Sequence, residues 1–281
     1  MSDVAVIDTP AAMSAWSEAA RARGQRIGFV PTMGYLHAGH VALVEEARRR
    51  SEVVAVSIFV NPTQFGPQED LARYPRDLPG DLAKISGAGA AVAFVPAPAA
   101  MYPPGYQTYV EVRELSQGLC GERRPGHFVG VATVVLKLFQ IVRPHLALFG
   151  EKDFQQLAVV RRMVRDLHVP VEVVALPTVR EADGLAMSSR NSYLSPGDRV
   201  RAVALSRGLR AAQQRRAAGE TSADKLVATA RAEILPHVDS LDYLEVRDAD
   251  TLQPVTSVEG PAVILVAAYL GTTRLIDNLR I

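Results

Sequence analysis

The stretch Pro31-Thr32-Met33-Gly34-Tyr35-Leu36-His37-Ala38-Gly39-His40 decides how this sequence folds. It follows a short apolar run at residues 26–30, which is typical of a strand, and it precedes a helical pattern at residues 41–48. At such a strand-to-helix turn, free N–H groups and the positive end of the helix dipole attract phosphate groups. His37 and His40 are three residues apart, so a helical first turn would place both imidazoles on one face. The stretch therefore predicts a phosphate-binding turn in an α/β protein.

Strand and helix patterns alternate around this turn from residue 27 to about residue 176. Continuous β-branched runs such as residues 52–60 are typical of strands buried on both faces. We therefore expect a Rossmann-like, doubly wound parallel sheet, whose ligands bind at the carboxyl ends of the strands. Further strands are expected at residues 91–95, 145–149 and 171–176, with helices at 11–23, 81–86, 129–142 and 154–167. Residues 108–112 alternate like an exposed strand and are expected to form one.

The character of the sequence changes after residue 178. Two arginine-rich helical patterns cover residues 196–217 and 222–235, and strand-like runs follow at 241–246, 262–269 and 273–281. We expect residues 1–178 to form the Rossmann-like domain and residues 179–281 to form a smaller α+β domain.

Composition narrows the class of protein. The 281 residues are 48% hydrophobic and 22% charged, close to the globular average, and the net charge of +1 favours neither nucleic acid nor an anionic membrane as partner. The single cysteine, Cys120, excludes an intrachain disulfide and a cysteine-rich metal site. The chain opens without a signal-peptide pattern, and its longest apolar stretch, residues 128–142, is too short to span a bilayer. A cytoplasmic protein is the expectation.

The paired histidines have competing interpretations. A single histidine is more often a core residue, but these two share one turn with Gly34 and Gly39, which permit close backbone approach to a ligand. A zinc site is the rival hypothesis, and it lacks a third ligand at motif spacing. The nucleophile elbow, the P-loop and a Gly-x-Gly-x-x-Gly turn after a strand are absent from the sequence.

Two further segments carry groups suited to phosphate. Gly150-Glu151-Lys152-Asp153 places one of only four lysines at a second strand-to-helix turn, although a solvated charged turn is an equal alternative. Ser188-Ser189-Arg190 supplies hydroxyl donors and a forked cation, or else is an ordinary linker with a helix cap. Gln64 and Gln156 would suit a substrate with hydroxyl and carboxylate groups, although glutamines are usually surface residues.

Five motifs, in this order, resemble the pantoate–β-alanine ligase family over essentially the whole length. They are Pro31-Thr32-Met33-Gly34-x-Leu36-His37-x-Gly39-His40, Phe59-Val60-Asn61-Pro62-x-Gln64-Phe65, Tyr74-Pro75-Arg76, Phe149-Gly150-Glu151-Lys152-Asp153-x-Gln155-Gln156 and Asp183-Gly184-Leu185-Ala186-Met187-Ser188-Ser189-Arg190-Asn191. The His-x-Gly-His element alone indicates only the wider nucleotidyltransferase superfamily.

The resemblance implies an ATP-dependent ligase that works in two steps. Pantoate would attack ATP to give pantoyl adenylate and pyrophosphate, and β-alanine would then displace AMP to give pantothenate. ATP is implied as substrate, Mg²⁺ as its metal partner, and a homodimer as the assembly. The first domain would bind ATP and pantoate, and the second would carry the Ser-Ser-Arg loop and close over the site.

The resemblance also assigns residues to roles. His40 matches a proton donor, with His37 as a second phosphate donor and Lys152 and Arg190 gathering on the triphosphate. Gln64 matches a residue that contacts pantoate and β-alanine, and Gln156 one that contacts pantoate. The implied ATP-binding set is Pro31, Thr32, Met33, Gly34, Tyr35, Leu36, His37, Ala38, Gly39, His40, Gly150, Glu151, Lys152, Asp153, Val179, Met187, Ser188, Ser189 and Arg190.

The sequence departs from some relatives after Tyr-Pro-Arg, where they carry a carboxylate-rich stretch. Here Gly80 and Lys84 stand at the expected ligand positions, which leaves Asp81 as the candidate metal ligand of this segment. Two other functions stay open at this point. One is a cytidylyl- or adenylyl-transferase whose product keeps the nucleotide, and the other is a non-catalytic nucleotide-binding or scaffold protein.

Overall fold

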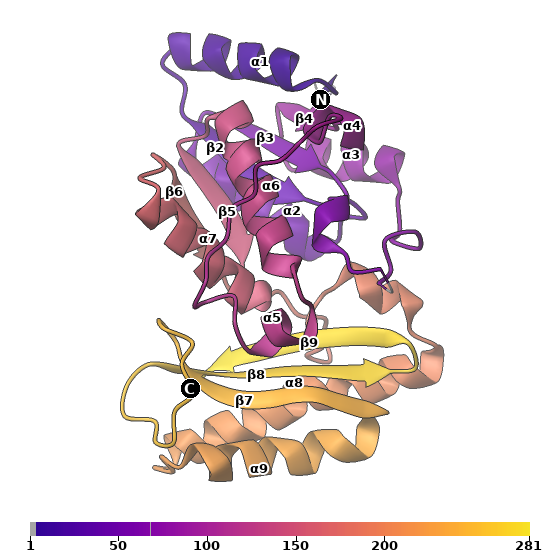
Figure 1. The fold of residues 1–281 in the computed structure, drawn as a ribbon. Helices are drawn as coiled ribbons and strands as arrows, with labels where there is room; N and C mark the ends of the chain where they lie inside the picture. The colour runs from indigo at the N-terminus through magenta and orange to yellow at the C-terminus, as the bar shows by residue number, and fades with distance from the viewer. Residues whose placement is uncertain (1–3, 68) are drawn as a thin grey trace. The chain divides into compact units, whose positions relative to one another are not determined.

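The computed structural model describes residues 4–67 and 69–281. They form two compact units, one of residues 4–67, 69–151 and 156–177 and one of Lys152–Gln155 with Thr178–Ile281. The elements up to residue 177 are β1 (Ala5–Ile7), α1 (Pro10–Ala22), β2 (Ile27–Thr32), α2 (Ala38–Arg50), β3 (Val53–Ile58), η1 (Pro62–Gln64), α3 (Leu78–Gly87), β4 (Val92–Phe94), α4 (Pro98–Met101), α5 (Leu119–Arg123), α6 (His127–Val142), β5 (Leu146–Gly150), η2 (Glu151–Asp153), α7 (Phe154–Asp166) and β6 (Glu172–Leu176). Figure 1 traces them along the chain.

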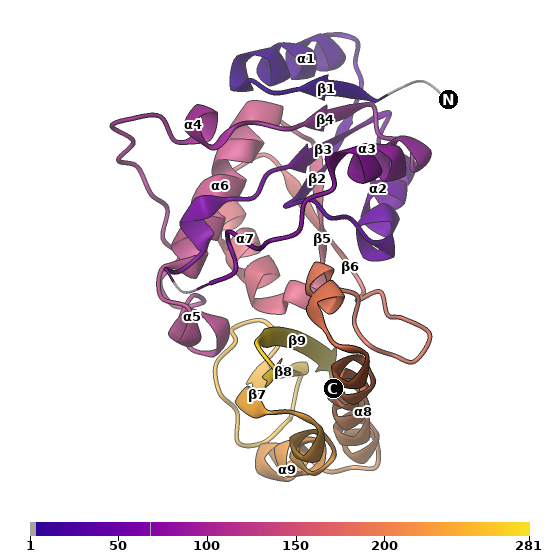
Figure 2. The same cartoon turned by 90° about the vertical axis from the view of Figure 1, so that its right-hand side faces the viewer.

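The first unit is built on a six-stranded parallel sheet in the order β1-β4-β3-β2-β5-β6, which confirms the predicted doubly wound fold. Seen edge-on in Figure 2, α6 lies on one side of this sheet and α2 and α3 lie on the other. Strands β2 and β3 pair in register from Ile27↔Val53 to Thr32↔Ile58. Both strands are almost wholly buried, as the continuous apolar runs of the sequence require.

The strand order reverses between β2 and β5. From β2 the chain adds β3 and β4 on one side, and it then crosses to the other side of β2 to add β5 and β6. Open α/β sheets bind their ligands outside the carboxyl ends of the strands at this kind of switch point. The fold therefore places the carboxyl ends of β2 and β5 next to each other, at the edge where a ligand is expected.

Helix α6 is apolar on nearly all sides and supports this edge from one face of the sheet. A Cβ at Gly130 would lie 2.4 Å from the Thr63 carbonyl oxygen, so this helix can approach η1 closely only because residue 130 is glycine. In the ranges 4–67 and 69–281, neither α6 nor any other helix combines the length and apolarity needed to cross a membrane.

The structure differs from the sequence-based expectations in two places. The strand expected at residues 108–112 is wrong, because this segment has no ladder partner and the Val110 N–H donates to Thr133 Oγ1 of α6 at 2.9 Å. The short strand β1 was not expected from the sequence, and it forms by parallel pairing with β4 at the edge of the sheet.

The second unit is a three-stranded antiparallel sheet covered by two helices. Its elements are η3 (Ser189–Tyr193), α8 (Pro196–Ala217), α9 (Ala223–Ile234), η4 (Leu235–His237), β7 (Ser240–Asp248), β8 (Ala262–Leu270) and β9 (Thr273–Arg280), with sheet order β7-β8-β9. Helices α8 and α9 pack on each other and on this sheet, and their apolar residues form a separate core with β8. The smaller α+β part of the predicted fold is thus confirmed.

Candidate functional site

The loop after β2 turns sharply before helix α2 begins. Gly34 has φ 86° and Tyr35 has φ 52°, so two successive residues occupy the left-handed region that favours glycine. Thr32 Oγ1 donates to the Ser57 carbonyl at 2.7 Å and accepts from the Gly34 N–H at 3.2 Å. This hydroxyl ties the start of the turn to the neighbouring strand β3.

A buried carboxylate holds the far side of the same turn. Asp81, only 1% exposed, accepts hydrogen bonds from the N–H groups of Tyr35 at 2.8 Å and Leu36 at 2.6 Å. Hydrogen bonds to a charged acceptor are stronger than those between neutral groups. The geometry favours an anchoring role for Asp81 over the metal-binding role considered from the sequence, because both of its oxygens hold backbone N–H groups.

Replacing Asp81 by asparagine should lower the free energy of unfolding by about 2–3 kcal/mol, since one loop N–H would then face an amide NH₂ group. The matched control is Asp77→Asn. Asp77 is the exposed N-cap of α3, where its side chain accepts from the Gly80 N–H at 3.1 Å. Asparagine caps helices about as well as aspartate, so the control should change stability by less than about 0.5 kcal/mol. Urea unfolding midpoints measure the stability of both variants. Equal losses of stability in the two variants would contradict the anchoring role of Asp81.

His37 and His40 form the N-terminal cap of α2. His37 Nδ1 accepts from the Gly39 N–H at 3.1 Å, and His40 Nδ1 accepts from the His37 N–H at 3.3 Å. The ring centroids are 4.1 Å apart, as the three-residue spacing predicts. Because each Nδ1 accepts a hydrogen bond, the proton of each neutral ring is assigned to Nε2. The turn therefore carries two imidazole Nε2–H donors at the positive end of a helix.

Gln64 belongs to η1, the turn after β3, and its side chain is buried. Asn61 Nδ2 donates to Gln64 Oε1 at 3.1 Å, and Gln64 Nε2 lies 3.2 Å from Met33 Sδ of the motif turn. Tyr102 fixes the orientation of the Asn61 amide, since its hydroxyl donates to Asn61 Oδ1 at 2.8 Å. Burial raises the pKa of Tyr102 to about 12, which holds the proton on this hydroxyl more firmly than on an exposed tyrosine.

Arg124 and His127 hold the backbone of Gln64. His127 Nδ1 lies 2.9 Å from the Gln64 carbonyl oxygen, and its Nε2 lies 3.0 Å from Arg124 Nη1. A carbonyl can only accept and a guanidinium can only donate, so the proton of His127 is assigned to Nδ1. Arg124 also forms an ion pair with Glu69. Burial raises the pKa of the Glu69 carboxyl, but the hydrogen bonds and charge of Arg124 outweigh this effect and hold the pKa of Glu69 below its usual value.

These supporting groups were not found from the sequence. Asn61 lies inside the motif of residues 59–65, but the motif by itself indicates no role for its amide. The i,i+3 spacing of Arg124 and His127 was the only signal that they act together. Their target, Gln64, lies 60 or more positions away along the chain, so nothing in the local pattern identifies it.

The remaining predicted residues divide between the two units. Gly150 ends β5, beside β2, and Gln156 lies half-buried on α7 in the first unit. Lys152 and Asp153 group with the second unit, where Lys152 Nζ lies 3.8 Å from Asp153 Oδ2. The second unit also contains Val179 and Met187–Arg190.

The loop of the second unit is ordered by its own hydrogen bonds. The Met187 N–H donates to the Val179 carbonyl at 3.0 Å, so these two predicted ATP-binding residues are adjacent. Ser188 caps η3 by accepting from the Arg190 N–H at 3.2 Å. The helix-cap interpretation of Ser188 is therefore confirmed.

Metal-binding groups do not gather in the described part of the chain. Over residues 4–67 and 69–281, no cluster of three or more His, Cys, Asp or Glu side chains is arranged to hold an ion. The donor set therefore does not fit a metal held mainly by protein side chains.

Known proteins resemble this chain in both sequence and fold. A family model described as pantoate-beta-alanine ligase matches residues 5–280. A relative called pantothenate synthetase from Myxococcus xanthus is 59% identical over 280 residues, covering 99% of this chain and 96% of the relative. One of the same name from Anaeromyxobacter dehalogenans is 56% identical over 283 residues, covering 98% of each chain.

Two solved structures share the fold over nearly its whole length. Pantothenate synthetase from Thermus thermophilus superposes with a TM-score of 0.93 at 48% identity, covering 98% of this chain and 99% of the other. A pantoate-beta-alanine ligase from Francisella tularensis, complexed with beta-gamma ATP and beta-alanine, superposes with a TM-score of 0.81 at 33% identity, covering 98% and 97%.

Proposed function

Because this chain belongs to the pantoate–β-alanine ligase family and is an enzyme of that kind, we propose that it joins its two substrates through pantoyl adenylate, releasing pyrophosphate and AMP. The observation that carries the proposal is the pair of Nε2–H donors that His37 and His40 hold at the N-terminus of α2. Donors fixed in this way suit a reaction whose growing charge lies on phosphate oxygens.

In the first step, a carboxylate oxygen of pantoate bonds to the α-phosphorus of ATP, and the bond from that phosphorus to the β-phosphate oxygen breaks. Pyrophosphate leaves with the electron pair, and no proton needs to move. The nucleophile is already ionised, so the step requires no serine, cysteine or strong base. Catalysis then rests on groups that bind the phosphates more tightly in the transition state than in the ground state.

In the second step, the neutral amine of β-alanine bonds to the acyl carbon and displaces AMP. The bond from the acyl carbon to the phosphate oxygen breaks, AMP leaves with its electron pair, and the amine nitrogen gives up one proton to water. The tautomer assigned to His40 favours a hydrogen-bond donor to a phosphate oxygen over full proton transfer, because Nδ1 already accepts the His37 N–H. His40 would thereby stabilise negative charge on the α-phosphate in both steps.

The substrate roles extend this proposal residue by residue. Gln64 would contact pantoate and β-alanine, and its buried, doubly fixed position supports a binding role over a surface role. Gln156 would contact pantoate from α7. The ATP-binding roles of Pro31–His40, Gly150–Asp153, Val179 and Met187–Arg190 rest on the family resemblance, as do the division of labour between residues 1–178 and 179–281 and closure of the second domain.

Mg²⁺ enters the proposal as the partner of the ATP phosphates. Without a cluster of protein carboxylates in the described ranges, the ion would be held largely by phosphate oxygens and water, as is usual for Mg²⁺ with nucleotides. The resemblance further supports a homodimer and a cytoplasmic enzyme.

An isotope experiment tests the adenylate directly. Pantoate labelled with ¹⁸O in its carboxylate is incubated with ATP, Mg²⁺ and β-alanine, and the AMP is examined by mass spectrometry. One ¹⁸O per AMP is expected, because the attacking oxygen stays on phosphorus when the acyl bond breaks. Without β-alanine, pantoate-dependent exchange of pyrophosphate into ATP is expected, with AMP limited to about one equivalent per site.

The same experiment separates the alternatives. Formation of ADP with unlabelled nucleotide would indicate an acyl phosphate and contradict the adenylate. A nucleotidyltransferase would keep the nucleotide in its product and release only pyrophosphate. A scaffold protein would release neither AMP nor pyrophosphate.

A further inference from the structure

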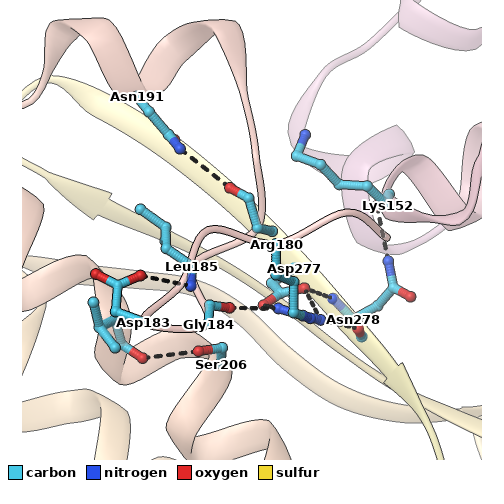
Figure 3. A network of polar contacts seen from close by, with 11 residues as sticks. Lys152, Arg180, Asp183, Gly184, Leu185, Asn191, Ser206, Asp277 and Asn278 are labelled. Atoms are coloured by element: carbon cyan, nitrogen blue, oxygen red, sulfur yellow. Dashed lines mark hydrogen bonds and ion pairs between the residues drawn. The ribbon is translucent and has the colours of Figure 1, made fainter. Parts of the chain in front are cut away.

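Strand β9 of the second unit contacts two segments that are far apart in the sequence. One is the segment that carries Lys152, and the other is the loop of residues 178–191. Figure 3 shows the contacts, with Asp277 and Asn278 of β9 at their centre. Both segments carry residues that the proposed function assigns to ATP, so their common support bears on how that nucleotide is bound.

The first contact is a buried, bidentate ion pair. Arg180 Nη1 lies 2.7 Å from Asp277 Oδ2, and Arg180 Nη2 lies 2.9 Å from Asp277 Oδ1. The side chain of Asp277 is 1% exposed and that of Arg180 is 16% exposed. Paired N–H donors from a planar guanidinium fix orientation as well as distance. The pair therefore locks the start of the 178–191 loop onto β9.

The same guanidinium also closes the loop on itself. Arg180 Nη1 donates to the Gly184 carbonyl at 3.0 Å, and a β-bridge joins Arg180 to Ala186. At the far end, Asn191 Nδ2 donates to Glu181 Oε1 at 3.0 Å and to the Ala186 carbonyl at 3.2 Å. Met187–Arg190 therefore lies between Ala186, which pairs with Arg180, and Asn191, which bonds to Glu181. Both ends of this loop are held by Arg180 or by the residue next to it.

The second contact ties Lys152 to the neighbouring residue of the strand. Asn278 Nδ2 donates to the Lys152 carbonyl oxygen at 2.8 Å, and the Asn278 N–H donates to Asp277 Oδ1 at 2.8 Å. Asn278 is 6% exposed. The Asp277 carboxylate therefore contacts both the Arg180 guanidinium and Asn278, whose side chain bonds to the Lys152 carbonyl.

We propose that Asp277 and Asn278 are positioning residues that hold Lys152 and the Ser188–Arg190 loop in one frame for binding the ATP phosphates. The proposal rests on the proposed function for its ligand, but the frame itself is formed entirely by residues of the second unit. Neither residue is assigned to touch the nucleotide. They act through the backbone of Lys152 and through Arg180.

The physical reason is that phosphate-binding groups must be in place together. A cation and hydroxyl donors shifted by about 1 Å lose much of their effect on a bound, reacting group. Lys152 and Ser188 are separated by 36 positions in the chain, so chain connectivity alone cannot hold them in register. Hydrogen bonds to Asp277 and Asn278 can hold them in register, because these two residues are adjacent on strand β9.

The kinetic test compares Asp277→Asn and Asn278→Asp with Asp242→Asn. Asp242 is a matched control, because it also pairs with an arginine in this sheet, Arg274, at 2.7 Å and 12% exposure. Both test variants should lower kcat/KM for ATP about tenfold or more while KM for β-alanine stays within about twofold. The control should leave kcat/KM for ATP within about twofold.

A second measurement does not depend on activity. Hydrogen–deuterium exchange of the substrate-free protein should rise in the peptides covering residues 152–155 and 178–191 of both test variants, and not in the Asp242→Asn control. If Asp277→Asn proves too unstable to purify, Asn278→Asp still tests the proposal, since it removes one donor from the frame and keeps the ion pair.

The outcomes separate this proposal from the proposed function. Equal losses in the control variant, a parallel rise in KM for all three substrates, or unchanged exchange in both segments would overturn the positioning role. Failure of the wild-type enzyme to form AMP from ATP and pantoate would overturn the proposed function instead, and the exchange result would still decide whether the frame exists.

Discussion

Replacing His40 by alanine is expected to lower kcat by about 100-fold or more, as is usual when one fixed donor to a developing oxyanion is lost. The imidazole of His40 lies at the positive end of α2, with its ring centroid 4.1 Å from that of His37. Because the donor is held before substrate binds, its contribution costs no reorganisation during the reaction. Steady-state formation of AMP and pantothenate at saturating substrate gives the comparison.

A second substitution separates this donor from the helix cap. His40 Nδ1 also accepts the His37 N–H, so alanine should cost about 1 kcal/mol of stability through the lost cap. His40→Asn offers a side-chain oxygen for that N–H and no equivalent of Nε2–H. It should recover most of the stability and remain as inactive as His40→Ala.

The control for both variants is His168→Ala, which removes an exposed imidazole from the turn that follows α7. It should leave kcat unchanged. Near-normal turnover of a folded His40→Ala enzyme would remove His40 from the mechanism.

Replacing Lys152 by glutamine is expected to lower kcat/KM for ATP by about 100-fold, because a charge-assisted contact to phosphate is lost where a cation neutralises charge. The side chain is 19% exposed and lies beside Asp153, while its backbone carbonyl accepts from Asn278. Glutamine keeps that carbonyl, so the loss should come from the ammonium group and not from a rearranged second unit. Initial rates at varied ATP measure it.

The matched control is Lys225→Gln. Lys225 pairs with Glu220 at 3.4 Å and its side chain is 63% exposed, so its loss should change stability by less than about 0.5 kcal/mol and leave the kinetics unchanged. If Lys152→Gln kept kcat/KM for ATP within about threefold of wild type, Lys152 would have no phosphate role.

Much of the sheet could be predicted because its determinants are local. Strand β3 and helix α6 are nearly continuous apolar runs, whose burial does not depend on which neighbour covers them. The segment at residues 108–112 shows where this reasoning stops. The alternation of polar and apolar residues in this segment indicates that one side is exposed. A strand also needs a hydrogen-bonded neighbour strand, and here the N–H of Val110 donates to Thr133 of α6 instead.

The candidate site likewise contains residues identified by local sequence and residues whose role depends on distant parts of the chain. His37 and His40 could be identified because their spacing and their glycines are features of one turn. The position of Asp81 after a motif makes it a candidate metal ligand, whereas its oxygens hold the backbone of Tyr35 and Leu36, 46 and 45 positions earlier. A carboxylate is equally suited to both tasks, so its residue type cannot distinguish them.

The sequence by itself determined the doubly wound sheet, the turn that carries His37 and His40, and the family, because periodicity and motifs are properties of neighbouring residues. Only the tertiary structure decided what holds that chemistry in place. Asp81 anchors the turn, Arg124 and His127 hold Gln64, and β9 holds Lys152 together with the Ser188–Arg190 loop. The reason is physical. A hydrogen bond between distant residues leaves no periodic trace, and its partner is chosen by whichever groups the packed elements bring within about 3 Å of each other.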